Sequence, residues 1–249
     1  MKSYYIDYLN AKLHYQIGGK ESAPILVLLH GGFGSIDDFV TLMPVLAQQF
    51  RLIAIDTRGH GRSTLGDVAL TYTQAADDVR YILQQLNITK FSLFGFSDGG
   101  TIAYHLGLAE SAIEKIITVG AHWHRDNLRE VRPMFEMLNV AFVNENMPEQ
   151  LEKYLTQNPQ ADLEKWVNTL KAMWLDETES GYPNERIAQI KTPILAVRGE
   201  ADFLLSLADI VALQQYLPDV HLMNVPFAAH EVAKEQPKLL LEAIQTFFQ

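Results

Sequence analysis

The stretch that most constrains the fold is residues 91–100, FSLFGFSDGG, where an apolar run ends in a serine flanked by glycines. The run is typical of a buried strand, and residues 101–108 are typical of a helix. At Gly95 and Gly99 a Cβ would collide where the strand and helix approach each other. A turn of this kind lifts a serine hydroxyl out of a sheet on strained backbone. The pattern G-x-S-x-G also arises by chance, but its strand-before and helix-after context favours a nucleophile at Ser97.

Strand-like runs alternate with helical patterns on both sides of this stretch. A hairpin over residues 3–9 and 12–17 is followed by strands expected over 25–29, 51–55, 115–119, 193–198 and 220–225. Helices are expected over 36–49, 71–86, 207–217 and 234–248. This alternation predicts an α/β fold with a mostly parallel, doubly wound sheet and right-handed crossovers. In such sheets the ligand site lies at the carboxyl ends of the strands.

Between residues 121 and 185 the rhythm changes. Strand-like runs are missing, and helical patterns cover residues 128–143, 148–157 and 162–175. A helical block inserted after a strand of this kind of sheet lies over the active-site edge as a lid, and some of its side chains then line the substrate pocket. We therefore predict an α/β core of residues 1–120 and 186–249, with an inserted helical lid of residues 121–185.

Charge and composition narrow the class of partner. The chain has 30 acidic and 20 basic residues, a net charge of −10, which argues against nucleic acid or an anionic membrane because phosphate binding needs Lys and Arg. It has no cysteine, so a disulfide and a cysteine nucleophile are excluded. No stretch is long enough to span a bilayer, and the start of the chain lacks an apolar signal segment. These features favour a cytoplasmic enzyme acting on a small molecule, with its oligomeric state left open.

A catalytic serine needs a base, normally an imidazole held by a carboxylate. On this kind of sheet the chain order is serine, acid, histidine. Of the two histidines after the lid, His221 falls inside the last strand, whereas His230 follows it in a loop. Asp202 directly follows a strand end, where an aspartate also commonly caps a loop, and the later aspartates lie within or after a helix. We predict a triad of Ser97, Asp202 and His230.

The oxyanion formed on attack needs two N–H donors. We predict the backbone N–H of Asp98, at the start of the helix, and that of Gly32, in the glycine-rich loop 30–35. Phe33 and Trp123 are predicted to line the substrate pocket together with the Asp98 side chain.

The sequence predicts neither a metal nor a cofactor. His122 and His124 are two residues apart, but they lack the carboxylate cluster that a metal site would add. The chain also has no G-x-G-x-x-G and no phosphate-binding loop, so no nucleotide cofactor is expected.

The assembled residues resemble the α/β-hydrolase superfamily over essentially the whole chain. The matching segments are HGGFGS at 30–35 for the oxyanion loop, DTRGHGRS at 56–63 for the structural D-x-R-G-x-G-x-S segment, GEAD at 199–202 for the acid loop and AH at 229–230 for the histidine loop. The chain departs from the family at Ala229, where glycine commonly precedes the histidine, and at Phe203, where proline commonly follows the acid.

Within the superfamily, GFSDGG at 95–100 with the lid after it is similar to the biphenyl-hydrolase-like group, which includes valacyclovir hydrolase. Valacyclovir hydrolase cleaves α-amino-acid esters, and the resemblance implies that Asp98 holds the substrate ammonium. An aspartate in the first turn of a helix is also favoured by the helix dipole alone.

The leading hypothesis is a serine hydrolase that cleaves a small carboxylic ester through an acyl-enzyme, with α-amino-acid esters as one candidate class. Hydrolysis of a carbon–carbon bond in a diketone-type substrate uses the same triad and lid and stays open. A second class is a small-molecule sensor on the same fold with slow turnover. Dehalogenases and epoxide hydrolases are disfavoured because those relatives place Asp where Ser97 stands.

Overall fold

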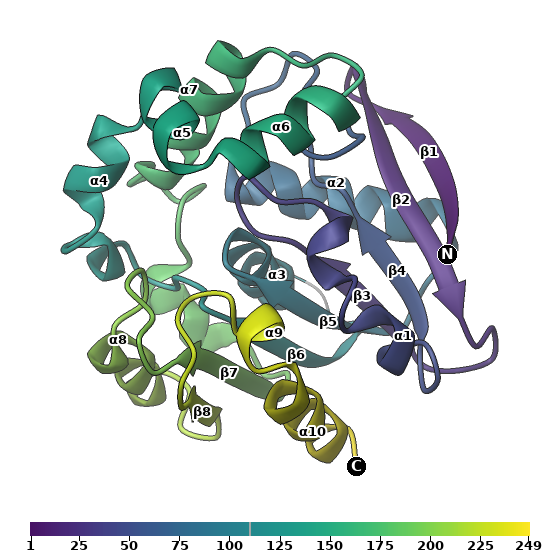
Figure 1. Ribbon diagram of the computed structural model, residues 1–249. Helices are drawn as coiled ribbons and strands as arrows, with labels where there is room; N and C mark the ends of the chain where they lie inside the picture. Colours follow the sequence, from purple (N-terminus) through teal and green to yellow (C-terminus); the bar gives the residue numbers. More distant parts are fainter. Residues whose placement is uncertain (110) are drawn as a thin grey trace.

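A single sheet runs through the centre of the molecule (Figure 1). The computed structural model describes residues 1–109 and 111–249. Its eight strands lie in the order β1-β2-β4-β3-β5-β6-β7-β8. They are β1 Lys2–Tyr8, β2 Ala11–Gly19, β3 Ile25–Leu29, β4 Arg51–Ile55, β5 Phe91–Phe96, β6 Ile113–Val119, β7 Ile194–Gly199 and β8 His221–Val225. The β1–β2 hairpin and the β2–β4 pair are antiparallel and all other pairs are parallel, which confirms the predicted mostly parallel α/β fold.

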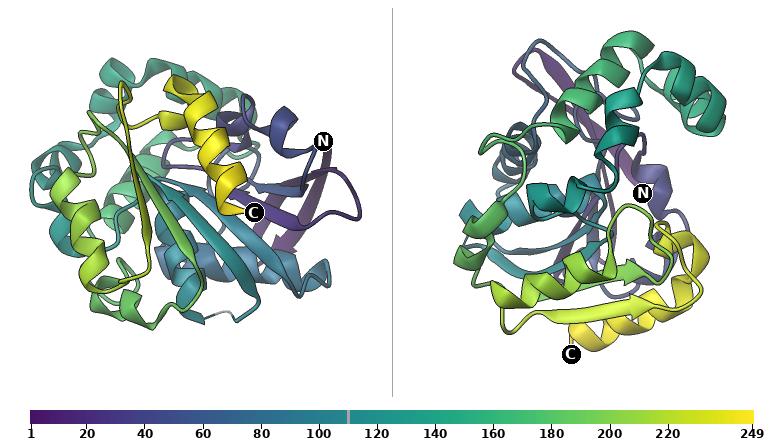
Figure 2. Two further views of the ribbon diagram at one scale, coloured as in Figure 1. Left: turned by 90° about the horizontal axis from the view of Figure 1, so that it is seen from below. Right: turned by 90° about the vertical axis from the view of Figure 1, so that its left-hand side faces the viewer.

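Helices cover both faces of this sheet (Figure 2). They include α1 Met43–Leu46, α2 Tyr72–Gln85, α3 Asp98–Ala109, α8 Leu207–Ala212, α9 Val232–Glu235 and α10 Pro237–Phe247, with the short 3-10 turns η1 Ile36–Phe39 and η4 Leu213–Gln215. Successive side chains of β3 enter different cores, because side chains alternate across a strand. Val27 and Leu29 pack with α2 and α3, whereas Leu26 and Leu28 pack with α1 and α10.

Four helices that the sequence pattern predicts as continuous are divided: 36–49, 128–143, 207–217 and 234–248. The segment 36–49 forms η1 and α1, because Ser35 and Asp38 make a capping box that closes a 3-10 turn. Pro44 then opens α1, and a proline restricts the residue before it and lacks an N–H. The C-terminal segment 234–248 is likewise interrupted at Pro237, which begins α10.

The helices between β6 and β7 form a separate layer, drawn in teal and green at the top of Figure 1. They are η2 Arg125–Leu128, α4 Arg132–Met137, α5 Val140–Asn146, α6 Pro148–Gln157 and α7 Leu163–Trp174, and η3 Asn184–Gln189 leads back to β7. We call α4 to α7 the cap helices. The predicted single helix over 128–143 breaks at Leu138, whose ψ is 124°, and Asn139 caps α5 by accepting the Phe142 N–H at 3.0 Å.

The two ends of this insertion meet. The Asn184 N–H donates to the Trp123 carbonyl at 2.9 Å, and the Arg125 N–H donates to Asn184 Oδ1 at 2.9 Å. We call these three residues the neck. Within the described residues, no helix combines the length and apolar character needed to cross a membrane.

Candidate active site

Ser97 stands on a strained turn between β5 and α3. Its φ is +50°, in the left-handed region that residues other than glycine rarely adopt. The backbone leaves no room for side chains beside it: a Cβ on Gly95 would lie 2.3 Å from the Gly99 oxygen, and one on Gly99 would lie 2.0 Å from the Leu29 oxygen. The Ser97 N–H donates to the Val119 carbonyl of the neighbouring strand at 2.8 Å. The serine is therefore held at the carboxyl end of the sheet by backbone contacts alone.

Asp202 and His230 are paired at the same end. His230 Nδ1 lies 3.0 and 3.1 Å from the two carboxylate oxygens of Asp202. One of these oxygens also accepts the N–H groups of Leu204 at 2.9 Å and Leu205 at 3.2 Å. Burial raises the pKa of Asp202, but the hydrogen bond and charge of His230 and the two N–H groups outweigh burial and hold the pKa below its ordinary value. The ionised carboxylate makes Nδ1 the donor, which leaves Nε2 as the basic nitrogen.

The serine and the histidine line one cavity. The His230 ring lies 5.0 Å, centroid to centroid, from the ring of Phe96, the residue before Ser97. Among the described residues, the Ser97 hydroxyl has no hydrogen-bond partner. Catalytic hydrogen bonds are often long in enzymes without substrate and tighten in the substrate complex.

Two N–H groups at the predicted positions are available to an oxyanion. Asp98 is the first residue of α3, where an N–H has no partner within the helix. In the part of the chain that the structure describes, the Gly32 N–H has no hydrogen-bond partner either. The loop that carries Gly32 has Phe33 at a φ of +58°, and His30 anchors it by accepting the Thr57 N–H on Nε2 at 3.0 Å. Gly32, Phe33 and Asp98 all line the cavity.

The Asp98 side chain links three elements. One carboxylate oxygen accepts the Tyr72 hydroxyl of α2 at 2.7 Å, and the other accepts the Trp174 indole N–H of α7 at 2.8 Å. Burial raises the pKa of Asp98, and these two hydrogen bonds lower it only in part. The carboxylate therefore ties the first turn of α3 to the cap helices, a connection that the sequence did not predict.

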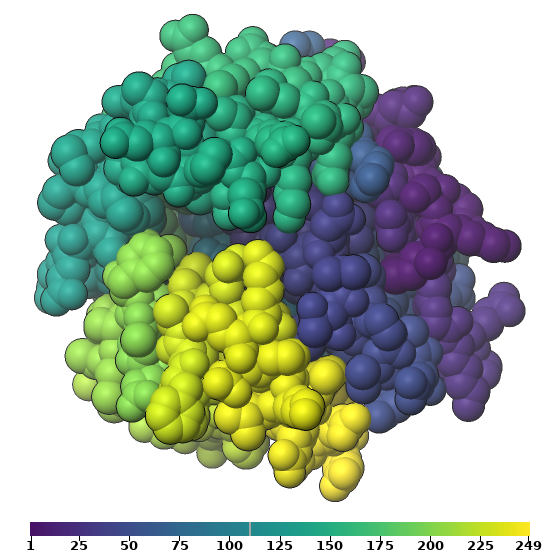
Figure 3. Space-filling view, in the orientation of Figure 1, coloured from purple at the N-terminus to yellow at the C-terminus, as the bar shows by residue number. Residues whose placement is uncertain are grey.

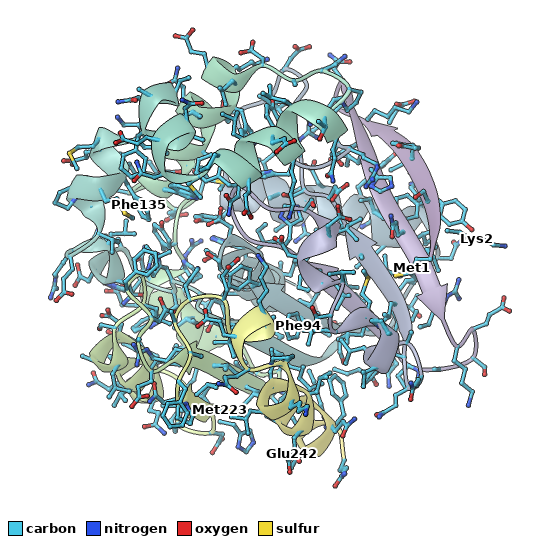
Figure 4. The ribbon with its side chains drawn as sticks, viewed as in Figure 1. Met1, Lys2, Phe94, Phe135, Met223 and Glu242 are labelled. Atoms are coloured by element: carbon cyan, nitrogen blue, oxygen red, sulfur yellow. The ribbon has the colours of Figure 1, made fainter. Side chains whose placement is uncertain are left out.

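The cavity has a volume of about 420 Å³ and lies between the sheet and the cap helices. Its apolar lining includes Phe33, Met134, Phe135, Leu138, Phe142, Trp166, Trp174 and Leu204. Figure 4 marks Phe135, which contributes from α4. Trp123 does not line the cavity, contrary to the prediction. Its indole N–H donates to the Asp209 carbonyl at 3.0 Å and its ring packs on Tyr216, so the side chain is held against α8 and the segment after it.

The segment 56–63 supports the site without lining most of it. Asp56 is fully buried and accepts the Ile36 N–H at 2.8 Å, and it pairs with His14 Nδ1 at 2.7 Å. Arg58 makes a buried two-bond contact with Asp78 at 2.7 and 2.8 Å. These contacts join β2, η1, β4 and α2, so the segment fixes the position of the loop that carries Gly32.

Comparison with known proteins gives the family. Residues 24–172 match the model of the alpha/beta hydrolase fold family, and the chain belongs to this family. It is 26% identical to 3-oxoadipate enol-lactonase 1 of Acinetobacter baylyi, over 94% of this chain and 92% of that protein. It is 27% identical to the sn-1-specific diacylglycerol lipase ABHD11 of Danio rerio, over 93% of this chain and 80% of that protein.

Solved structures agree on the fold. The structure of E-2-(acetamidomethylene)succinate hydrolase superposes with a TM-score of 0.80 at 21% identity, covering 99% of this chain and 98% of that one. Family membership and the enol-lactonase and lipase relatives support a hydrolytic function for the chain.

Proposed function

We propose that this protein is a serine hydrolase that cleaves a small carboxylic ester through an acyl-enzyme. The observation that carries the proposal is the convergence in one cavity of Ser97 on a strained turn, the His230–Asp202 pair and two unpartnered N–H groups. The names of an enol-lactonase and a diacylglycerol lipase among the relatives support the ester class.

In the proposed reaction each group has one step. His230 Nε2 takes the proton of the Ser97 hydroxyl as the oxygen attacks the ester carbonyl. The N–H groups of Gly32 and Asp98 hold the oxyanion, and losing one such donor typically costs about 3 kcal/mol of transition-state stabilisation. The imidazolium, stabilised by Asp202, then protonates the departing alcohol. Water attacks the acyl-enzyme in the reverse sequence and releases the acid.

Steady-state hydrolysis of a simple short-chain ester tests this proposal. We expect many turnovers by the wild-type chain and a loss of about 1000-fold or more in kcat in Ser97→Ala. Ser22→Ala, at an exposed turn, is the matched control and should keep wild-type activity. A single turnover by the wild type would indicate a sensor. The absence of turnover would contradict the ester proposal and favour carbon–carbon hydrolysis or sensing.

The ammonium hypothesis for Asp98 has its own test. An ester with a free α-amino group and its counterpart without one are compared in the wild type and in Asp98→Asn. Preference for the amino ester that disappears in the variant would support the hypothesis. The Tyr72 and Trp174 donors already on the carboxylate favour instead equal rates on the two esters.

A further inference from the structure

The cavity also has a polar part, where it opens between α6 and α9. Four charged side chains line this part: Asp38 of η1, Lys153 of α6, and Glu231 and Lys234 at α9. We call them the mouth cluster. Figure 3 shows the recess between the cap helices in teal and the C-terminal segment in yellow. The mouth cluster is separate from Ser97 and His230 but shares their cavity.

Asp38 has unused capacity to accept hydrogen bonds. In the described structure its carboxylate accepts only one hydrogen bond, from the Ser35 N–H, and that bond is long at 3.4 Å. Burial raises the pKa of Asp38, and the nearby charges of Lys234 and Lys153 lower it only in part. Within the described residues, neither lysine forms an ion pair with Asp38. A carboxylate in the wall of a reaction cavity is thus left for a ligand.

Hydrogen-bond donors line the same part of the cavity as Asp38. Lys153 Nζ and the Gln150 side-chain amide line the cavity, and among the described residues neither makes a hydrogen bond. Lys234 is partly committed, because its Nζ donates to Glu231. The mouth cluster and the neighbouring Gln150 together therefore offer a ligand at least one free carboxylate acceptor and two free donor groups, those of Lys153 and Gln150.

The charges of the mouth cluster balance: two lysines face two carboxylates. A cationic ligand would meet Lys153 and Lys234, whereas an anionic one would meet Asp38 and Glu231. A neutral group with several hydroxyls meets neither penalty, since each hydroxyl both donates and accepts. Hydrogen bonds between a hydroxyl and a charged partner are also the stronger kind.

We infer that the mouth cluster binds the leaving group of the substrate, and that this group is an uncharged alcohol bearing further hydroxyls. The inference rests on the proposed ester hydrolysis. The acyl part would lie against the apolar lining, where Phe135 and Phe142 stand, and the alcohol would reach toward α6 and α9. Water adds across the ester bond, so the products are a carboxylic acid and the free polyhydroxylated alcohol.

Four butyrate esters that differ only in the alcohol test the inference: propyl, 2,3-dihydroxypropyl, choline and 2-carboxyethyl. Each kcat/KM is divided by the rate of hydroxide-catalysed hydrolysis of the same ester, which removes differences in leaving-group reactivity. We expect the 2,3-dihydroxypropyl ester to exceed the propyl ester by about tenfold or more, the effect of one or two hydrogen bonds to charged groups. A ratio near one, or preference for either charged ester, would overturn the inference.

Substitutions in the mouth cluster test whether its side chains cause the preference for the dihydroxypropyl ester. Asp38→Asn keeps an oxygen for the Ser35 N–H, and Lys153 is exposed on α6, so both variants should fold. In Asp38→Asn and Lys153→Met the ratio between the dihydroxypropyl and propyl esters should fall about tenfold. Lys238→Met, on the exposed side of α10, is the matched control and should keep the wild-type ratio.

The two proposals fail in different ways. Ser97-dependent turnover of propyl butyrate with a ratio near one would remove the role of the mouth cluster and leave the serine hydrolase intact. No turnover of any of the four esters would overturn both.

Discussion

The carboxyl end of the sheet and the cap helices are held in place by different means. At the sheet end, the pairing of backbone strands holds the site residues in position: Leu29 pairs with Gly95, and Val119 pairs with both Phe96 and Val197. The cap helices are tied down by side chains, such as Trp174 on Asp98. The pairing of the strands persists through most substitutions, whereas a side-chain contact is lost when one of its residues is substituted. We therefore expect the sheet end to set the reaction and the cap helices to set which substrates bind.

The largest expected effect is on kcat, when a proposed catalytic residue at the sheet end is substituted. Asp202→Asn should lower kcat by about 10⁴-fold, because an amide no longer fixes His230 Nδ1 as the donor. The fold should persist, since the new side-chain amide would keep an oxygen for the Leu204 and Leu205 N–H groups. Stopped-flow or steady-state kinetics and a thermal melt measure the two quantities. A fall in kcat of less than tenfold would contradict the role given to Asp202.

A smaller effect is expected on the cap side. Trp174→Phe keeps an aromatic ring but removes the donor to Asp98, which should cost about 1 kcal/mol of unfolding free energy. Because Trp174 lines the cavity, the variant should also change relative kcat/KM across a series of acyl chains. Trp123→Phe is the matched control: it too loses an indole hydrogen bond, but outside the cavity. Equal acyl selectivity in the two variants would contradict the distinction, and chemical denaturation checks the stability.

The smallest expected effect is on the free energy of unfolding, whose dependence on pH should have opposite signs for the contributions of Asp202 and Asp98. The folded-state pKa of Asp202 is lowered, so the stability it contributes is present above its unfolded pKa of about 3.9 and is lost as pH falls through the folded value. The folded-state pKa of Asp98 is raised, so its contribution is present below about 3.9 and is lost as pH rises through the folded value.

Urea unfolding between pH 3 and 6 measures this difference. The destabilisation caused by Asp202→Asn should grow as pH rises, and that caused by Asp98→Asn should shrink. Slopes of the same sign would contradict the opposite environments of the two carboxylates.

The same division explains how far the sequence could be interpreted. Strands covered on both faces are apolar throughout, and a serine between glycines at a strand end has few structural alternatives, so the sheet and the position of Ser97 were predictable. Asp202 and His230 were placed by the same rule, each in a loop after a strand. Their pairing in space agrees with the predicted triad, whose catalytic role the kinetic experiments test.

Contacts between distant side chains left no such pattern. Tyr72 and Trp174 lie 26 and 76 residues from Asp98, and neither stands in a recognisable motif. The helical periodicity over 128–143 contains Pro133 in the first turn of α4, but it has no proline or glycine at the break itself, which falls at Leu138. The prediction for Trp123 was wrong for another reason. An aromatic side chain next to a strand end can pack in the core as readily as it can line a pocket.

The neck gives the insertion a property that matters over evolutionary time. Trp123 and Arg125, where the chain leaves the sheet, are bonded directly to Asn184, where it returns. The two ends of the insertion are therefore joined to each other outside the cap helices, while side chains such as Trp174 tie the cap helices to the core separately. An exchange of the residues between these points preserves both junctions and leaves Ser97, Asp202 and His230 in place, but it replaces the Trp174 contact with Asp98. We therefore expect the neck to mark the boundaries at which the cap can be exchanged as one piece, with a change in specificity and not in the chemistry.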